Sequence, residues 1–513
     1  MEKSAHPYFK YQPLLLAICA IIGMYGGYKL KLPEQKNKLS FDSNLKNYTS
    51  GQKITDALSY IDSKYVDSLK INEASDYMIQ QLCLALDPYS EYIPANQVQE
   101  YMDDLDGGYH GIGLSFIKFD ETWMANNVLK NSPAELGGIE PGDEILSING
   151  HTNKEEDFSP EGLTKSNPFE VDLKWKKQGS GEVIAKKIRK ENLESSTLGP
   201  VFPIDQNVFY LRLNSIGERS YREFMDKVEK YTFGQGRKSL ILDLRDNSGG
   251  LLNIAADILN QLVPVRNVEL FSTINREGKK KSFNSLGKPF FKLDKIIILI
   301  NEHTASSAEI IAGSLQELKL AKLLGFPSFG KATVLEPFNL ADGSQILLAT
   351  SRILLPSGRC IQKPYYTYSK DSITNWISPF NPIADSFGRS SNKYVSAMGL
   401  SPDWVVEKDD SMIELSDDEQ LQLRNIMLSN YQALKIAIAG KVENITSKET
   451  DQLLEGYLSK NNQLLINSNS LFQMKERSKF ILAELLFGMN ASQNLQLIND
   501  PVFARAKKEI SLN

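Results

Sequence analysis

The chain has 513 residues and a formal net charge of −5, with 58 lysines and arginines against 63 aspartates and glutamates. A chain of this length corresponds to about three or four domains and can bury a large core. With 41% hydrophobic and 24% charged residues, the composition excludes a disordered chain, and the lack of basic excess argues against nucleic acid as a partner.

The three cysteines, Cys19, Cys83 and Cys360, are too few and too scattered for a disulfide framework or a tetrahedral zinc site. A metal site built on cysteines is therefore not expected. A Cys83–Cys360 disulfide is one alternative, but the sequence favours unpaired buried thiols.

The N-terminal segment, residues 1–32, contains the apolar stretch PLLLAICAIIGMYGGYKL, which has no charge before Lys29. An apolar run of about 15 residues is short for a membrane span and fits a signal-peptide core or a marginal signal anchor. No small-x-small cleavage site follows, and Ile18 before Cys19 does not fit a lipoprotein signal. We favour an uncleaved anchor over a cleaved signal, and both over a buried helix, which would show a polar face. Lysines on both sides leave the orientation open.

Residues 33–105 begin as a polar linker and continue with helical patterning. Apolar residues three and four apart predict helices within 54–66 and 74–87, and Pro88 closes the second.

Residues 106–195 combine short alternating strands with glycine and proline turns, and Ser132 with Pro133 predicts the start of a short helix. The motifs GIGL and SPAELGGIEPGDEILSING resemble a PDZ domain. The resemblance implies a carboxylate-binding loop made of Gly111, Ile112, Gly113 and Leu114. Converging backbone N–H groups bind an anion in such a loop, and the exposed strand after it accepts an extended peptide.

Two strand–turn–helix units follow within residues 196–407. The first has an apolar strand at 239–244, the turn RDNSGG and a helix at 251–263. The second has a strand at 295–300, the turn NEHTAS and a helix at 307–321. Buried strands alternating with helices predict a parallel or mixed α/β sheet, whose sites lie at the carboxyl ends of strands. Both turns directly follow the carboxyl ends of their strands.

Ser306 is the candidate nucleophile, and a simple helix cap is the alternative. Ser306 and Glu309 have the S-x-x-E spacing of a capping box. A serine after a buried strand and at a helix N-terminus also lies where N–H groups can stabilise an oxyanion. The equivalent turn holds Gly249 and Gly250, either of which would bring a second N–H beside that of Ser307.

The base is the next question, and the chain has only four histidines, His6, His110, His151 and His303. Their positions argue against a histidine-based triad. Lys331 lies 25 residues after the serine and follows a strand-like run that ends in Gly330. Its apolar neighbours would lower the pKa of its ammonium group from about 10.4, and serine–lysine pairs are a known variant of the triad. The alternative is a solvated surface lysine.

Five motifs follow the PDZ-like segment in order: LILDLRDNSGGLL, TASSAEIIAGSLQ, LLGFPSFGKATV, PSGRCIQKPY and GLSPDWV. Together with LDPYSEYI before that segment, they resemble the carboxy-terminal processing, or tail-specific, proteases of the serine–lysine type. The likeness runs from about Ile54 to Val406.

The resemblance implies a ClpP/crotonase-like α/β core with an inserted PDZ domain. It implies that Ser306 is the nucleophile and Lys331 the base, and that Ser307 with Gly249 or Gly250 forms the oxyanion hole. Such an enzyme cleaves proteins captured by their free C-termini and needs no cofactor. The expected location is the periplasm of a bacterial cell envelope, at the inner membrane, and a homo-oligomer is possible.

One position departs from the family pattern. The glutamine that usually follows four residues after the lysine, and orients it, is Leu335 here. Leucine makes no hydrogen bond, so a catalytically impaired PDZ adaptor is the rival to an active protease. Residues 408–513 are polar with helical stretches and carry no motif that indicates chemistry.

Overall fold

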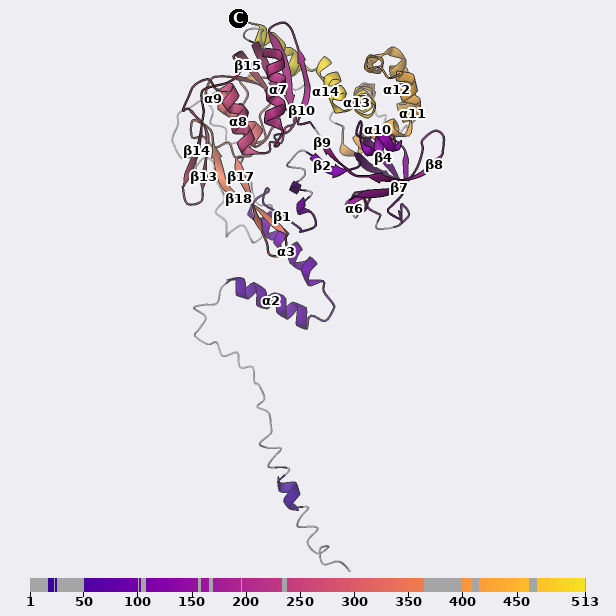
Figure 1. Cartoon of the computed structure of the whole chain (residues 1–513), viewed down its shortest axis with the longest axis vertical. Helices are drawn as coiled ribbons and strands as arrows, with labels where there is room; N and C mark the ends of the chain where they lie inside the picture. Colours follow the sequence, from indigo (N-terminus) through magenta and orange to yellow (C-terminus); the bar gives the residue numbers. More distant parts are fainter. Residues whose placement is uncertain are drawn as a thin grey trace, which may run out of the picture. The chain divides into compact units, whose positions relative to one another are not determined.

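The structure is a computed structural model (Figure 1). It describes residues 17–22, 24, 50–99, 101–102, 108–155, 158–165, 169–194, 196–232, 238–363, 399–407, 415–460 and 468–512. The chain divides into two compact units, Met1–Tyr77 and Met78–Asn513.

Two helices confirm the patterning predicted before the PDZ-like segment. Helix α2 covers Ser50–Lys64 in the first unit, and α3 covers Ile71–Leu86 across the boundary between the units. Most of the predicted anchor lies outside the described residues. In the part of the chain that the structure describes, no helix has the length and apolar character needed to cross a membrane.

The PDZ-like segment is an antiparallel sheet with the strand order β3-β4-β5-β7-β8, and β6 pairs with β5. Its elements are β3 (Leu114–Phe119), β4 (Thr122–Val128), α5 (Pro133–Gly137), β5 (Glu144–Ile148), β6 (His151–Thr152), α6 (Pro160–Lys165), β7 (Glu170–Lys176) and β8 (Val183–Arg189). Trp175 on β7 is fully buried in its core. Ser132 caps α5 as predicted, because its Oγ accepts the Glu135 N–H at 3.3 Å.

The second unit also holds a six-stranded sheet with the order β10-β11-β12-β15-β16-β19. Its strands are β10 (Leu198–Pro203), β11 (Val208–Leu213), β12 (Lys238–Asp243), β15 (Leu293–Ile300), β16 (Lys322–Gly325) and β19 (Trp404–Val405). Only β10 runs antiparallel, which confirms the predicted mixed α/β sheet.

Both faces of this sheet are buried, so its strands are continuously apolar. Leu240 and Leu242 face the helices α7 (Ser220–Thr232), α8 (Leu252–Leu262) and α9 (Ser307–Glu317). Ile241 points to the opposite face and packs against the C-terminal helix α15 (Pro501–Ser511). Alternate residues of one strand thus serve two hydrophobic cores.

Two predicted elements end earlier than expected. Helix α9 stops at Glu317 rather than near residue 321, and Lys319 takes up a left-handed conformation there, with φ of 60°. The strand-like run before Lys331 is a strand only as far as Gly325, because Pro327 cannot donate to the ladder.

A second, antiparallel sheet has the strand order β1-β18-β13-β14, with β17 paired to β18. Its strands are β1 (Glu91–Ile93), β13 (Glu269–Asn275), β14 (Lys280–Asn284), β17 (Thr333–Asn339) and β18 (Gln345–Leu354). Strand β1 precedes the PDZ-like sheet in sequence, yet it pairs with β18 of the core. A ribbon of β2 (Gly108–Gly111) and β9 (Glu191–Glu194) joins the two ends of the PDZ-like segment.

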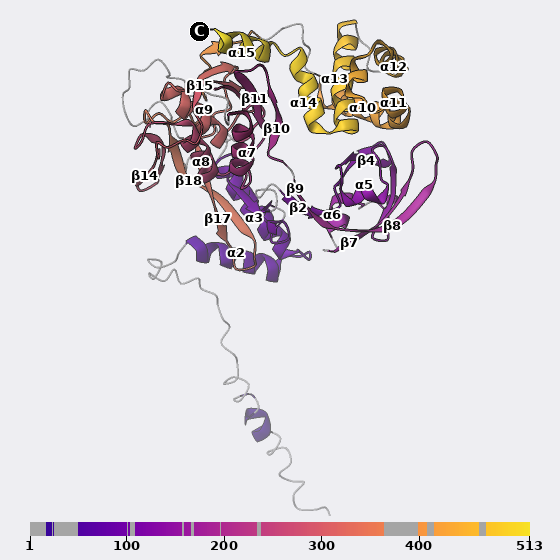
Figure 2. The same ribbon diagram turned by 45° about the horizontal axis from the view of Figure 1, so that its top comes forward.

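The C-terminal region is helical and touches both neighbours within the second unit. Its elements are α10 (Asp417–Ser429), α11 (Tyr431–Ile438), η4 (Val442–Thr446), α12 (Lys448–Ser459), α13 (Ser468–Phe487), α14 (Met489–Ile498) and α15. Arg424 on α10 bonds to Asn126 of the PDZ-like sheet and to Glu484 on α13. At the other end, α15 lies beside β15 of the core sheet (Figure 2).

Phe503 anchors α15 to the core sheet. It is 5% exposed, and its ring centroid lies 5.1 Å from that of Tyr210. We expect Phe503→Ala to reduce the free energy of unfolding by about 3–5 kcal/mol, since it removes a buried ring and leaves a cavity. The matched control is Phe472→Ala on α13, where the side chain is 61% exposed. Urea titration followed by circular dichroism checks both, and equal effects would contradict the anchoring role.

Candidate active site

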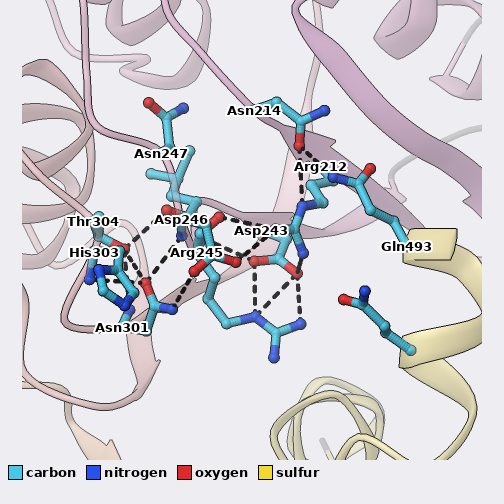
Figure 3. A network of polar contacts seen from close by, with 12 residues as sticks. Arg212, Asn214, Asp243, Arg245, Asp246, Asn247, Asn301, His303, Thr304 and Gln493 are labelled. Atoms are coloured by element: carbon cyan, nitrogen blue, oxygen red, sulfur yellow. Dashed lines mark hydrogen bonds and ion pairs between the residues drawn. The ribbon is translucent and has the colours of Figure 1, made fainter. Parts of the chain in front are cut away.

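The two turns predicted to carry the site lie side by side at the carboxyl edge of the core sheet, because β12 and β15 pair in parallel. Four hydrogen bonds join the turns: Ala305 N–H to Asn247 O (2.9 Å), Thr304 Oγ1 to Leu244 O (2.9 Å), Asp246 N–H to Asn301 Oδ1 (3.0 Å) and Asn301 Nδ2 to Asp246 Oδ1 (2.8 Å). Figure 3 shows these turns and the polar network behind them.

Ser306 occupies a strained backbone conformation at the point where α9 begins. Its φ and ψ are 54° and −124°, values that residues other than glycine rarely adopt. Its N–H donates to the Glu309 carboxylate at 2.9 Å, as a capping box requires. Ser306 is partly exposed, whereas the hydroxyl of Ser307 is buried and has no hydrogen-bond partner in the part of the chain that the structure describes. Of the two serines, only Ser306 therefore presents a side chain to a substrate.

The glycine turn lies directly against this serine. A Cβ on Gly249, which has φ of 98°, would come within 2.8 Å of the Ser306 Cβ and 3.0 Å of the Ser307 nitrogen. The Gly249 N–H is already taken, because it donates to Asn247 Oδ1 at 2.8 Å. Within the described residues, the N–H groups of Gly250 and Ser307 have no acceptor. Of the two glycines that the sequence left open, Gly250 is thus the one with a free donor.

Glu309 links the serine turn to the lysine segment through one fully buried carboxylate. Its Oε2 accepts the N–H groups of Ser306 and Lys331, each at 2.9 Å. Its Oε1 accepts the Gly330 N–H at 2.8 Å and the Ser328 hydroxyl at 2.5 Å. Burial raises the pKa of Glu309 to about 7, although the four donors favour the anion. The sequence indicated a cap at this residue but not its contact with the lysine segment.

Lys331 lies just before β17 with a half-buried side chain. Its Nζ lies 5.0 Å from the ring centroid of Tyr89 and, within the described residues, makes no hydrogen bond or ion pair. Burial lowers the pKa of Lys331, while the carboxylates of Asp87 and Glu309 act against that shift. A lowered pKa is what a lysine needs to act as a base near neutral pH. Leu335 follows a bulge in β17 and offers no hydrogen bond.

A buried network of charges supports the glycine turn from behind (Figure 3). Asp243, fully buried at the end of β12, accepts the Tyr210 hydroxyl at 2.6 Å and Arg245 Nη2 at 2.7 Å. Burial opposes its ionisation, but Arg245 and Arg212 together hold the pKa of Asp243 below its ordinary value. Arg245 also pairs with Asp500 at the start of α15, with 2.6 Å between Nη1 and Oδ2. The turn is therefore tied to the C-terminal region.

The loop predicted to bind a carboxylate also has free donors. The N–H groups of Ile112 and Gly113 have no acceptor within the described residues, whereas the carbonyls of both accept backbone N–H groups at 2.8 and 2.9 Å. Gly113 has φ of 77°, and a Cβ there would lie 2.3 Å from Ser132 Cβ. Strand β3, which begins at Leu114, has only β4 as a neighbour in its sheet.

His303 and the three cysteines, the other side chains considered for chemistry, take no part in the arrangement described above. His303 is exposed, and its backbone N–H bonds to Asn301. In the described part of the chain, no group of three His, Cys, Asp or Glu side chains could hold a metal ion. The three cysteines are unpaired, as the sequence favoured, and Cys83 and Cys360 are buried.

Comparison with known proteins gives two family matches. Residues 207–368 match the model for peptidase family S41, and residues 124–155 match that for the PDZ domain. Both fall inside the segments where the sequence predicted a protease core and a PDZ domain.

Individual relatives agree with these matches. The carboxy-terminal processing protease CtpB of Bacillus subtilis (strain 168) is 28% identical over 323 residues, which are 61% of this chain and 65% of the relative. A probable CtpA-like serine protease of Staphylococcus aureus (strain N315) is 27% identical over 429 residues, 80% of this chain and 83% of the relative. The chain thus spans slightly less than two thirds of the first relative. A solved structure titled photosystem II D1 C-terminal processing protease is 18% identical, with a TM-score of 0.38, over 70% of this chain and 94% of its own.

Glu309 should make the stability of the chain depend on pH. Because its pKa is raised from 4.5 to about 7 in the folded chain, its stabilising effect is fully present below pH 4.5 and is lost as the pH rises through 7. The loss amounts to about 3 kcal/mol of unfolding free energy. We expect Glu309→Gln to remove this slope and, by placing an amide N–H opposite backbone donors, to destabilise the fold further. Urea unfolding at pH 5 and pH 8 measures both, and an unchanged slope in the variant would exclude Glu309 as the titrating group.

Proposed function

We propose that the chain is a serine endopeptidase of the carboxy-terminal processing kind, with Ser306 as nucleophile and Lys331 as base, because residues 207–368 match the model for peptidase family S41 and the chain is similar to proteases of that name. One observation carries this proposal above the others. Ser306 lies partly exposed on a strained turn, next to Ser307 on that turn and against the glycine turn that carries Gly250, and within the described residues the N–H groups of Ser307 and Gly250 have no acceptor.

In the proposed reaction, Lys331 Nζ takes the proton from Ser306 Oγ, and Oγ attacks the carbonyl carbon of the scissile bond. The N–H groups of Gly250 and Ser307 stabilise the resulting oxyanion, while Gly249 allows the close approach of the two turns. The ammonium of Lys331 then protonates the leaving amine, which gives an acyl-enzyme. A water molecule, deprotonated by the same lysine, releases the second product and restores the serine.

We further propose that the PDZ domain captures the free C-terminus of the substrate. The N–H groups of Ile112 and Gly113 would bind the carboxylate, and the substrate would add a strand to the open edge of β3. By the same family likeness, occupation of the PDZ domain shifts the protease toward an open, active state.

The proposed domain limits are 1–32, 33–105, 106–195, 196–407 and 408–513, with a ClpP/crotonase-like core. The pairing of β1 with β18 across the intervening PDZ-like sheet supports an inserted PDZ domain. The apolar stretch near the N-terminus supports an anchor in the inner membrane that leaves the protease in the periplasm of a bacterial envelope. A homo-oligomer belongs to the same proposal by family likeness alone.

The rival function is a tethered PDZ adaptor with an inactive protease fold. Leu335 favours it, because the family's orienting glutamine is missing at that position. The protease would cleave a bound substrate and would need an intact Ser306 to do so, whereas the adaptor would bind the substrate without cleaving it.

Variants of the two turns separate these functions. With an unfolded protein that ends in an apolar residue as substrate, we expect Ser306→Ala and Lys331→Ala each to reduce kcat/KM by at least about 10⁴-fold. Ser307→Ala keeps the backbone N–H and His303→Ala tests a histidine base, so both should retain most activity. Gel and mass-spectrometric analysis of the products measures cleavage. Equal cleavage by the Ser306→Ala variant, or none by the wild type, would reject the protease.

Capture through the C-terminus has its own test. Amidation removes the carboxylate that the loop at Ile112 and Gly113 would bind, so we expect KM to rise about 10-fold or more while kcat changes little. Peptides that differ only in a free or amidated C-terminus provide the comparison. Equal KM values would reject PDZ capture as the entry step while leaving the protease assignment intact.

A further inference from the structure

The motif LDPYSEYI, residues 86–93, forms a fixed loop beside Lys331. Asp87 is buried, and its carboxylate accepts the N–H groups of Tyr89 (2.8 Å) and Ser90 (2.7 Å) together with the Ser90 hydroxyl (2.8 Å). These three bonds fix the backbone that carries Tyr89. The Tyr89 ring in turn lies within the range of a cation–π contact with the lysine ammonium, at 5.0 Å.

Gln362, from the motif PSGRCIQKPY, holds this ring and the lysine segment together. Its side chain is fully buried, and Nε2 donates to the Tyr89 hydroxyl oxygen at 3.2 Å and to the Lys363 carbonyl at 3.0 Å. Its Oε1 accepts the N–H of Ala332, the residue directly after Lys331, at 2.8 Å. A single side chain thus fixes the position of the ring relative to the backbone of the lysine.

We propose that Tyr89 and Gln362 position Lys331 as the base, in place of the glutamine that is absent at position 335. The inference rests on the proposed serine–lysine reaction and concerns positioning residues, which act through the lysine. When Lys331 takes the serine proton it becomes an ammonium, and the face of an aromatic ring attracts that cation. The ring accepts no proton from the lysine and leaves the nitrogen lone pair free for the serine.

The charged groups near Lys331 are already engaged. Asp87 and Glu309 act on its charge, but their oxygens accept three and four hydrogen bonds from other groups. Lys363 is exposed, and its N–H bonds to the Gly330 carbonyl. Within the described residues, the ring is therefore the group that holds the ammonium directly.

The pKa of Lys331 provides a readout that a purely structural role would not change. Tyr89→Leu keeps the site apolar but removes the ring, so we expect the lysine pKa to fall by about half to one unit. Tyr89→Phe keeps the ring and should leave that pKa unchanged. Competitive labelling of the full chain with acetic anhydride across pH, read by mass spectrometry of the Lys331 peptide, measures this pKa without requiring activity. An unchanged or raised pKa in Tyr89→Leu overturns the proposal.

Kinetics test the same contacts. We expect the acidic limb of kcat/KM to move to lower pH in Tyr89→Leu, in step with the labelling. Gln362→Leu frees the ring and the Ala332 N–H, and we expect kcat to fall about 5- to 10-fold at constant KM. A rise in KM with unchanged kcat would show a role in substrate binding and overturn the proposal for Gln362.

Tyr92→Leu is the packing control, because Tyr92 is a buried tyrosine on β1. It should lower stability without moving the Lys331 pKa or the acidic limb. Failure of this inference and of the proposed function can be told apart. If Ser306→Ala abolishes cleavage but Tyr89→Leu leaves the pKa in place, only the positioning role fails. If Ser306→Ala cleaves like the wild type, the protease assignment fails.

Discussion

The buried carboxylate of Glu309 is the interaction on which the geometry of the site depends. The serine turn follows β15, and the lysine segment joins β16 to β17; one backbone hydrogen bond, from the Phe329 N–H to the Thr304 carbonyl at 3.0 Å, joins the two directly. Glu309 connects them by accepting the backbone N–H groups of Ser306 and Lys331 on the same oxygen. Because these bonds fix backbone positions, they constrain both side chains without touching either. A carboxylate buried this deeply is tolerated only because four donors surround it.

The strain at Ser306 requires support from the surrounding fold. A non-glycine residue at φ of 54° costs of the order of 1–3 kcal/mol, and the four bonds between the two turns oppose its relaxation. Behind them, Asp243 and Arg245 extend the support to Asp500, which caps the start of α15. The helices before α15 contact the PDZ-like sheet through Arg424. The C-terminal region, which carries no recognisable motif, thus lies in contact with both the glycine turn and the PDZ-like sheet. Contact of this kind permits coupling between them, but coupling itself requires an element with two states.

Much of this architecture could be predicted from the sequence because local rules determine it. The continuous apolar strands at 239–244 and 295–300, the cap at Ser132 and the two turns at the carboxyl edge all follow from short-range patterns. The end of α9 could not be predicted, since nothing in the apolar pattern marks the left-handed Lys319. The contacts of Lys331 escaped prediction for a different reason. Tyr89 and Gln362 lie 242 residues before and 31 residues after it in sequence, and the pairing of β1 and β17 with β18 helps to bring their segments together.

The missing glutamine therefore has to be judged in space rather than by its place in the sequence. An orienting group for a lysine base must fix the nitrogen and must stabilise the ammonium more than the amine, and neither requirement specifies a hydrogen bond. A carbonyl oxygen at position 335 would meet both through one directional contact. An aromatic face stabilises the ammonium through its quadrupole, but it fixes the position of the nitrogen only if the ring itself is held in place. The need to hold the ring in place explains why a fully buried glutamine, bonded to the Tyr89 hydroxyl, accompanies it. The leucine at 335 is then compatible with an active base, and it no longer favours an inactive adaptor.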